Sequence, residues 1–327
     1  MKRYIKMVAG LMGVMASFTA CHNGDQDFDD YEGGTTAYFA YQSPVRTIVL
    51  GDDEYDTSID KEHKCEIKAT FGGSYSGSNG SVTVAVDNSL CEHLTFDDGT
   101  AVKAMPTEYY SLSTNTLNYN GGMKGSTVVQ LTDAFFNDPD AVKNTYVIPL
   151  VMTGQTGFSQ LLTGTLKEGA TGSRTNASIW DVTPKDYVMY CVKYQNKYSG
   201  YWLTNHNTST DDIEKASVVQ ITTRSLNSSV YSVEFQEGST IYKADLLLTF
   251  DANEKCTITS LTEGVTATGT GSFADDALLS WNNKYRDLIE LNAEITFSGG
   301  VKEKLNEKLV WHRSGVTKEE FSYTYNN

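Results

Sequence analysis

The sequence predicts an all-β protein with two modules, a β-sandwich followed by an antiparallel β-barrel or meander. The chain has 20 tyrosines and 11% aromatic residues, and such a composition is typical of the half-buried faces of antiparallel sheets. Short runs of alternating apolar and polar residues recur between Gly, Asn, Asp and Ser turn signals. Behind an N-terminal export segment, about 290 residues remain, which is enough for two domains of ordinary size.

The first 20 residues are predicted to be a signal peptide, and Cys21 to be the lipid-modified residue that follows it. Lys2, Arg3 and Lys6 form a positive region ahead of apolar residues 7–18. That apolar run is about half of the roughly 20 residues that a bilayer-spanning helix needs. The small residues before Cys21 resemble a bacterial lipobox. An ordinary cleaved signal with a free Cys21 is the alternative.

Residues 21–34 are predicted to be a solvated tether. The acidic run between Asp25 and Glu32 leaves too little apolar surface to offset the entropy of ordering it. An acidic run directly after a lipidated cysteine resembles the surface-export signal of Bacteroidetes lipoproteins. This resemblance implies an outer-membrane protein that is lipid-anchored and exposed on the cell surface.

Residues 35–167 are predicted to form the first module. The Gly/Ser/Asn tract at 72–80 predicts a hairpin loop, and Thr132 predicts the N-cap of one helical turn. Short strands at this spacing favour a β-sandwich. The strands expected are Ala37–Tyr41, Arg46–Leu50, Cys65–Phe71, Ser81–Val86, Thr127–Leu131 and Thr145–Met152.

Residues 168–184 are predicted to be a linker, and residues 185–327 a second module. The lengths of its strands and the turns between them favour a closed antiparallel barrel, lipocalin-like, or a meander. Because each module is long enough to bury its own core, we expect the two to fold separately. The strands expected are Ala216–Thr223, Val230–Glu234, Ala244–Phe250, Cys256–Leu261, Val265–Ser272, Asp287–Ile295 and Lys308–His312.

Four cysteines remain once Cys21 carries lipid: Cys65, Cys91, Cys191 and Cys256. Cys65 alternates with apolar residues, as on the buried face of a strand, and a buried free cysteine packs as a small apolar residue. Four free thiols are therefore expected. A Cys65–Cys91 disulfide is the one pairing left open, because an exported protein permits it.

Two motifs, His63-x-Cys65 and Cys91-x-His93, flank the predicted hairpin. Four soft ligands could converge on zinc there, but neither pair has the spacing of a zinc finger. No metal site is predicted.

Several segments resemble known Bacteroidetes proteins. YFAYQSPVRTIVLGDD, MPTEYYSL and LTDAFFNDPDAVKNTYVIPLVMTG resemble the immunoglobulin-like N-terminal domain of surface lipoproteins. The same domain precedes the catalytic barrel of some chitinase-type endo-glycosidases, where it is a non-catalytic accessory. WDVTPKDYVMYCVKY, VTATGTGSF, WNNKYRD and KLVWHRSGV resemble, in patches, the C-terminal barrel-like domain found beside it. The resemblance implies an immunoglobulin-like sandwich in a glycan-binding accessory protein of a polysaccharide-utilisation system.

No catalytic site and no cofactor are predicted. The acidic tether lacks the offsets of the chitinase-type D-x-x-D-x-D-x-E motif, and G-x-S-x-G and H-E-x-x-H do not occur. The net charge of −15 argues against nucleic acid as a partner.

Sugars bind to flat aromatic faces, while amides and carboxylates bind their hydroxyl groups. Ser199 and Gly200 predict a chain reversal that exposes the next side chains, so Tyr201 and Trp202 are the preferred platform. The alternative is that these aromatic residues belong to the barrel core. The residues expected to bind glycan are Tyr198, Tyr201, Trp202, Asn205, His206, Trp281 and Tyr285.

The sequence thus predicts a lipid-anchored surface protein that binds polysaccharide or oligosaccharide without catalysis, beside an outer-membrane sugar transporter. A structural or adhesive surface protein that contacts host matrix or another protein is the alternative. A glycosidase without a recognised motif is a third interpretation.

Overall fold

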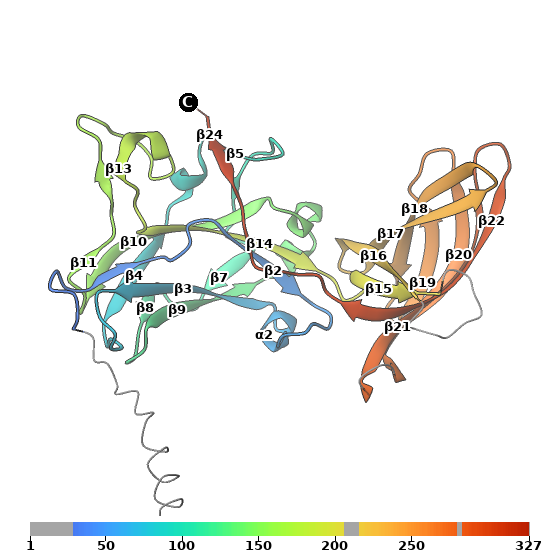
Figure 1. Ribbon diagram of the computed structural model, residues 1–327, viewed down its shortest axis with the longest axis horizontal. Helices are drawn as coiled ribbons and strands as arrows, with labels where there is room; N and C mark the ends of the chain where they lie inside the picture. Colours follow the sequence, from blue (N-terminus) through green and yellow to red (C-terminus); the bar gives the residue numbers. More distant parts are fainter. Residues whose placement is uncertain (1–28, 206–215, 280–282, 327) are drawn as a thin grey trace, which may run out of the picture.

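The strands of the computed structural model, which describes residues 29–205, 216–279 and 283–326, group into a sandwich and a barrel. The two lie end to end along the long axis of the molecule (Figure 1). The predicted all-β class is confirmed. No helix in the described part is long and apolar enough to cross a membrane.

The described helical segments are single turns. Two are α-helical, α2 (Ser58–Lys61) and α3 (Asp133–Phe136), and α3 follows Thr132 as predicted. Three are 3-10 turns: η2 (Asn88–Cys91), η3 (Pro139–Val142) and η4 (Ala177–Ile179).

The first sheet of the sandwich has five strands, in the order β11-β1-β3-β9-β7. Their bounds are β1 (Thr36–Tyr38), β3 (Lys64–Gly72), β7 (Tyr110–Leu112), β9 (Lys124–Leu131) and β11 (Gln160–Leu161). β3 and β9 pair antiparallel over most of their length, with Cys65 opposite Val129.

The second sheet has seven strands, in the order β23-β2-β14-β10-β4-β8, with β6 beside β10. Their bounds are β2 (Pro44–Val49), β4 (Ser81–Val86), β6 (Lys103–Ala104), β8 (Thr116–Asn118), β10 (Tyr146–Thr156), β14 (Tyr187–Gln195) and β23 (Glu319–Glu320). Two small pairs extend the sandwich: β12 (Thr165–Leu166) with β13 (Trp180–Val182), and β5 (Leu94–Phe96) with β24 (Tyr323–Tyr325).

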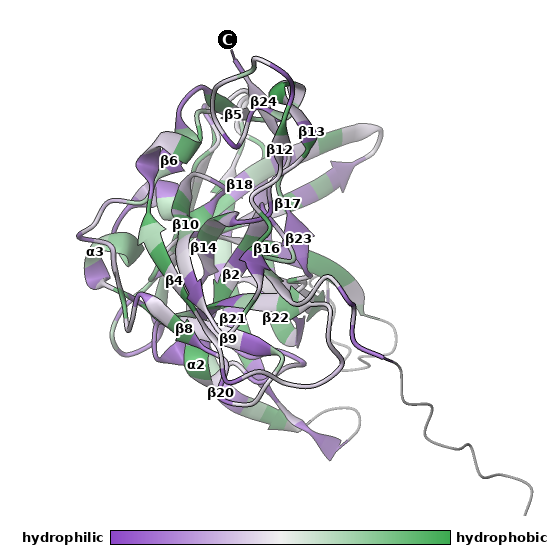
Figure 2. Cartoon of the chain, turned by 90° about the vertical axis from the view of Figure 1, so that its left-hand side faces the viewer, coloured by the Kyte–Doolittle hydropathy of each residue, from purple (hydrophilic) through white to green (hydrophobic). Residues whose placement is uncertain are grey.

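The sandwich core lies between the two sheets and is built from the alternating inward residues of their strands. Phe39, Ile67, Val129, Ile148 and Val192 are all buried there. Hydrophobic and hydrophilic residues alternate along the strands (Figure 2), which is the pattern expected of a sheet with one buried face.

The barrel is closed and all its neighbouring strands are antiparallel. Each strand pairs with the next along the chain, and the last pairs with the first. The strands are β15 (Gly200–Thr204), β16 (Ser217–Ser225), β17 (Ser228–Glu237), β18 (Thr240–Phe250), β19 (Lys255–Ser260), β20 (Thr266–Leu279), β21 (Tyr285–Thr296) and β22 (Lys302–Arg313).

The division between the modules differs from the predicted one. The predicted barrel domain begins at residue 185, but β14 belongs to the sandwich sheet, between β2 and β10. Residues 168–184 are not a linker between modules, since β13 pairs back on β12. β14 is an apolar run that is buried on both faces, so alternation alone could not assign it to a module.

The C-terminal residues also return to the sandwich. β23 pairs with β2, and β24 pairs with β5. The ring centres of Phe321 and Phe96 lie 5.2 Å apart. The chain therefore passes into the barrel from β14, on one side of β2. It returns from the barrel to β23, on the other side of β2.

Cys65, Cys91, Cys191 and Cys256 are all free and buried, which confirms the predicted free thiols. Cys65 lies in the sandwich core, whereas Cys91 lies in a separate cluster with Phe96 and Phe321. The two His/Cys motifs therefore do not meet.

Candidate functional site

The structure separates the predicted glycan-binding residues into several environments. Tyr198 closes the barrel end next to the sandwich. It is 4% exposed and stacks on Phe250, and its hydroxyl donates to Glu254 at 2.9 Å. These contacts make Tyr198 a core residue, and the predicted exposed platform at this position is wrong.

Trp202 is 0% exposed, so the predicted platform at Trp202 is also wrong. The turn at Ser199 lies before β15, not inside it. Side chains alternate from Gly200 onward, and Trp202 therefore points into the barrel, opposite Trp311.

Tyr201 faces outward and is half-buried. The guanidinium of Arg313 lies 4.8 Å from the centre of its ring. Gly315, at φ +76°, packs so closely on the ring that a side chain there would overlap it. Tyr201 lines a cleft of about 260 Å³ between the modules, with polar neighbours such as Gln220 and Thr222.

Three of the other predicted residues do not share the cleft of Tyr201 in the described structure. His206 and Trp281 lie outside the described residues. Tyr285 begins β21 and is 55% exposed, and its role in binding glycan stays a prediction.

Asn205 lies at a groove on the outer wall of the barrel, which we call the wall groove. Its volume is about 330 Å³, within the range of small-molecule sites. Its polar lining residues are Asn205, Lys255, Thr270, Ser272, Glu290, Asn292, Asn306, Glu307 and Lys308.

The strand register sets these side chains in two rows across β19 to β22. Ser272 pairs with Lys255 on one side and with Glu290 on the other, and Glu290 pairs with Lys308. In the second row, Asn292 lies between Thr270 and Asn306. Neighbouring strands are about 4.8 Å apart, so each row presents a polar group at regular short intervals.

A close approach of β20 and β21 underlies the groove. A Cβ atom at Gly271 would lie 2.3 Å from the carbonyl oxygen of Glu290, so no side chain fits there. Glycine at such a position is typical of tight bends in barrels. The groove lies over the same stretch of β20.

Five side chains of the groove have hydrogen-bonding capacity that the described residues do not use. In the described part of the chain, the side chains of Lys255, Thr270, Ser272, Glu290 and Asn292 make no hydrogen bond or ion pair. Charges elsewhere on the wall do pair: Lys302 contacts Glu294 at 2.7 Å, and Lys243 contacts Glu234. The wall groove therefore offers amide, hydroxyl, carboxylate and ammonium groups to a polar ligand.

Sequence reasoning found Asn205 and missed the other groove residues. Alternation predicts that they point outward, but their convergence depends on the register of four strands. The TGTGS stretch of β20 was the available signal, because it combines outward polar residues with inward glycines.

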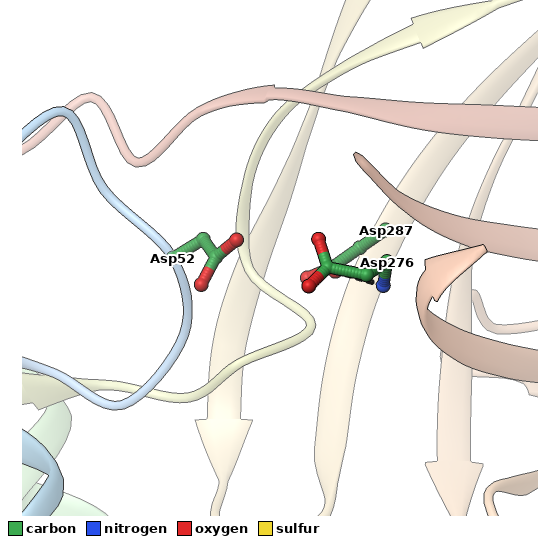
Figure 3. Close-up of side chains that lie close together, drawn as sticks. All are labelled: Asp52, Asp276 and Asp287. Atoms are coloured by element: carbon green, nitrogen blue, oxygen red, sulfur yellow. Dashed lines mark hydrogen bonds between the residues drawn. The ribbon is translucent and has the colours of Figure 1, made fainter. Parts of the chain in front are cut away.

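A second polar cluster lies where the modules meet (Figure 3). Asp52, from the loop after β2, faces Asp276 and Asp287 of the barrel, and their carboxylate oxygens lie within 4.8 Å of one another. Asp276 belongs to an irregular stretch of β20, and its N–H donates to Asp287 Oδ1 at 3.0 Å.

These carboxylates already have other contacts. Lys61 Nζ lies 3.4 Å from Asp52 Oδ1, and Asp287 Oδ1 accepts a hydrogen bond from the Asp276 N–H. Ca²⁺ takes six to eight oxygen ligands, and three such carboxylates alone do not define its site. We therefore do not assign them as metal ligands.

Burial and like charge act together on Asp287, which is 2% exposed. Burial, followed by the charges of Asp52 and Asp275, raises the pKa of Asp287 to about 7, against the opposing effect of the Asp276 N–H. Asp287 thus differs from an ordinary surface carboxylate in its tendency to hold a proton.

Two families match parts of the chain. Residues 188–315 match a family described as a domain of unknown function (DUF5627), which spans β14 and the barrel. Residues 31–159 match a family described as an N-terminal domain. No curated protein matches the chain.

Solved structures from Bacteroides ovatus are similar to this chain. A protein of unknown function is 29% identical, with a TM-score of 0.81, over 91% of this chain and 100% of its own. A multidomain protein including DUF1735 is 12% identical, with a TM-score of 0.39, over 84% of this chain and 92% of its own. A protein provisionally described as carbohydrate binding is 12% identical, with a TM-score of 0.26, over 89% of this chain and 98% of its own.

The first of these shares the fold over nearly the whole chain, whereas the other two are too different in structure to bear on function. The domain matches and the first of these Bacteroides ovatus structures together fit a protein of the Bacteroidetes.

Proposed function

We propose that the protein binds glycan in the wall groove as a lipid-anchored, non-catalytic accessory of a polysaccharide-utilisation system at the outer membrane. The observation that carries the proposal is a set of five groove side chains that make no hydrogen bond or ion pair in the described part of the chain: Lys255, Thr270, Ser272, Glu290 and Asn292.

A glycan matches the polar groups of this lining. Its hydroxyl groups donate and accept hydrogen bonds, and amide and carboxylate side chains match both roles. Asn292, Glu290 and Thr270 offer these groups together. The net charge of −15 disfavours nucleic acid.

The arrangement of the modules supports an anchor at the N-terminal end. Residues 29–35, which precede β1 and are blue in Figure 1, lie at the end of the sandwich away from the barrel. A lipid on Cys21 would therefore hold the groove away from the membrane. The acidic tether that follows Cys21 would add further reach.

Native electrophoresis in gels that contain immobilised polysaccharides tests the binding directly. Retarded migration in one of a panel of neutral and acidic polysaccharides is expected, with no release of reducing ends. Unchanged migration in every gel would contradict glycan binding and favour the adhesive alternative. Release of reducing ends would contradict the non-catalytic assignment.

Substitution of the predicted lipidation site tests the anchor. Cys21→Ala should move the protein from the membrane fraction to the soluble fraction of a cell lysate, because a lipid chain supplies the affinity for the bilayer. Cys256→Ala, at a buried cysteine of the barrel, is the matched control and should stay in the membrane fraction. A Cys21→Ala protein that remains membrane-bound after a salt wash would contradict lipid anchoring.

A further inference from the structure

The contact between the modules contains like charges from both sides. Asp52 belongs to the sandwich, whereas Asp276 and Asp287 belong to the barrel, and one carboxylate oxygen of each lies within 4.8 Å of the other two (Figure 3). The surrounding backbone is closely packed, since a Cβ atom at Gly51 would lie 2.9 Å from the Lys197 Cα atom. The loop that carries Asp52 therefore packs closely on the segment that leads into the barrel.

Other charged groups face the same contact. The loop also carries Asp53 and Glu54, and the barrel adds Asp275 beside Asp276. Glu54 lies near two groups of the barrel, Arg286 of β21 and His312 of β22. Arg313 follows His312 in β22. Burial and the two arginines lower the pKa of His312.

The positive groups nearby act on Asp52 and on Glu254, and none is among the main influences on Asp287. Lys61 Nζ lies 3.4 Å from Asp52 Oδ1, and both side chains are partly exposed. Lys197 pairs with Glu254 at 2.6 Å. The charged groups with the largest effects on Asp287 are Asp52 and Asp275, both of them acidic.

We propose that the carboxylates of Asp52, Asp276 and Asp287 make the contact between sandwich and barrel sensitive to pH. At low pH a proton on Asp287 removes one of the facing charges, and the contact is tight. At higher pH the proton is lost, and repulsion between the carboxylates weakens the contact.

The sign of the effect follows from the protonation of Asp287 in the two states. The pKa of Asp287 is about 7 in the folded protein, whereas an unfolded Asp has a pKa of about 3.9. The folded state therefore binds more protons than the unfolded state between these values. The stabilisation is complete below about pH 4 and is lost as the pH rises through about 7.

Thermal unfolding of the full chain between about pH 5 and about pH 8 tests this proposal. The melting temperature should fall by a few degrees over this range in the wild type. Asp287→Asn cannot lose a proton, and its melting temperature should fall less. Asp245→Asn, at an exposed position on the barrel wall, is the control and should follow the wild type.

Asp52→Asn shows whether the effect crosses between modules. Removal of this charge should lower the pKa of Asp287, as measured by carboxyl-carbon NMR, and should flatten the pH dependence of melting. A wild-type melting temperature that does not fall between pH 5 and pH 8 would overturn the proposal. So would a fall of equal size in the wild type, Asp287→Asn and Asp52→Asn.

Discussion

Trp202 of β15 lies directly opposite Trp311 of β22, and both side chains are buried inside the barrel. The pair lies where β22, the last strand of the barrel, pairs with β15, the first. Each Trp therefore contributes apolar area at the point that makes the barrel continuous, and neither is available to stack on a sugar.

Trp202→Ala should destabilise the protein by about 3–5 kcal/mol, the range for removal of a large aromatic side chain from a core. The free energy of unfolding, from urea denaturation followed by circular dichroism, measures this loss. Tyr285→Ala is the control, because Tyr285 is exposed and its removal should change stability by less than about 0.5 kcal/mol. A Trp202→Ala protein with wild-type stability would contradict its place in the core.

The C-terminal residues should stabilise the sandwich, although they follow the barrel in sequence. Phe321 is buried against Phe96 in a cluster that also holds Met189 and Cys191 of β14. Phe321→Ala should lower the free energy of unfolding by about 3–5 kcal/mol. Because β14 and β23 flank β2, the whole chain should unfold in one calorimetric transition.

The matched control for this position is the exposed residue Glu320→Ala, which should leave the transition near that of the wild type. Two separate transitions in the wild type would show that the modules unfold independently, as expected from the sequence alone. A fragment that begins at residue 176 should be destabilised, because it contains β14 without its neighbours β2 and β10.

The fold could be predicted from local pattern because most strands have one buried face. Cys65–Phe71 and Ala244–Phe250 alternate clearly, and both lie within observed strands. The module boundary could not be predicted. β14 is buried on both faces, and its pairing with β2 joins residues that are far apart in the sequence.

The site was predicted less well than the fold. The prediction treated Trp202 as exposed because a turn precedes it. Side chains alternate between the inside and the outside of the barrel along β15, and the position of Trp202 in this alternation points it inward. The groove residues come from four strands, and only the register brings Lys255, Glu290 and Asn292 together. Neither the register of a barrel nor the loss of side-chain partners can be read from residue type.

The affinity of groove variants for the retained polysaccharide tests the central claim most directly. Glu290→Ala/Asn292→Ala removes two unpartnered polar groups from the groove. Glu294→Ala/Lys302→Ala removes an ion pair from the same wall and is the matched control. Isothermal titration calorimetry should show affinity weakened by about tenfold or more for the groove variant, with the control equal to the wild type. Wild-type affinity in the groove variant, or an equal loss in both, would contradict glycan binding in the wall groove.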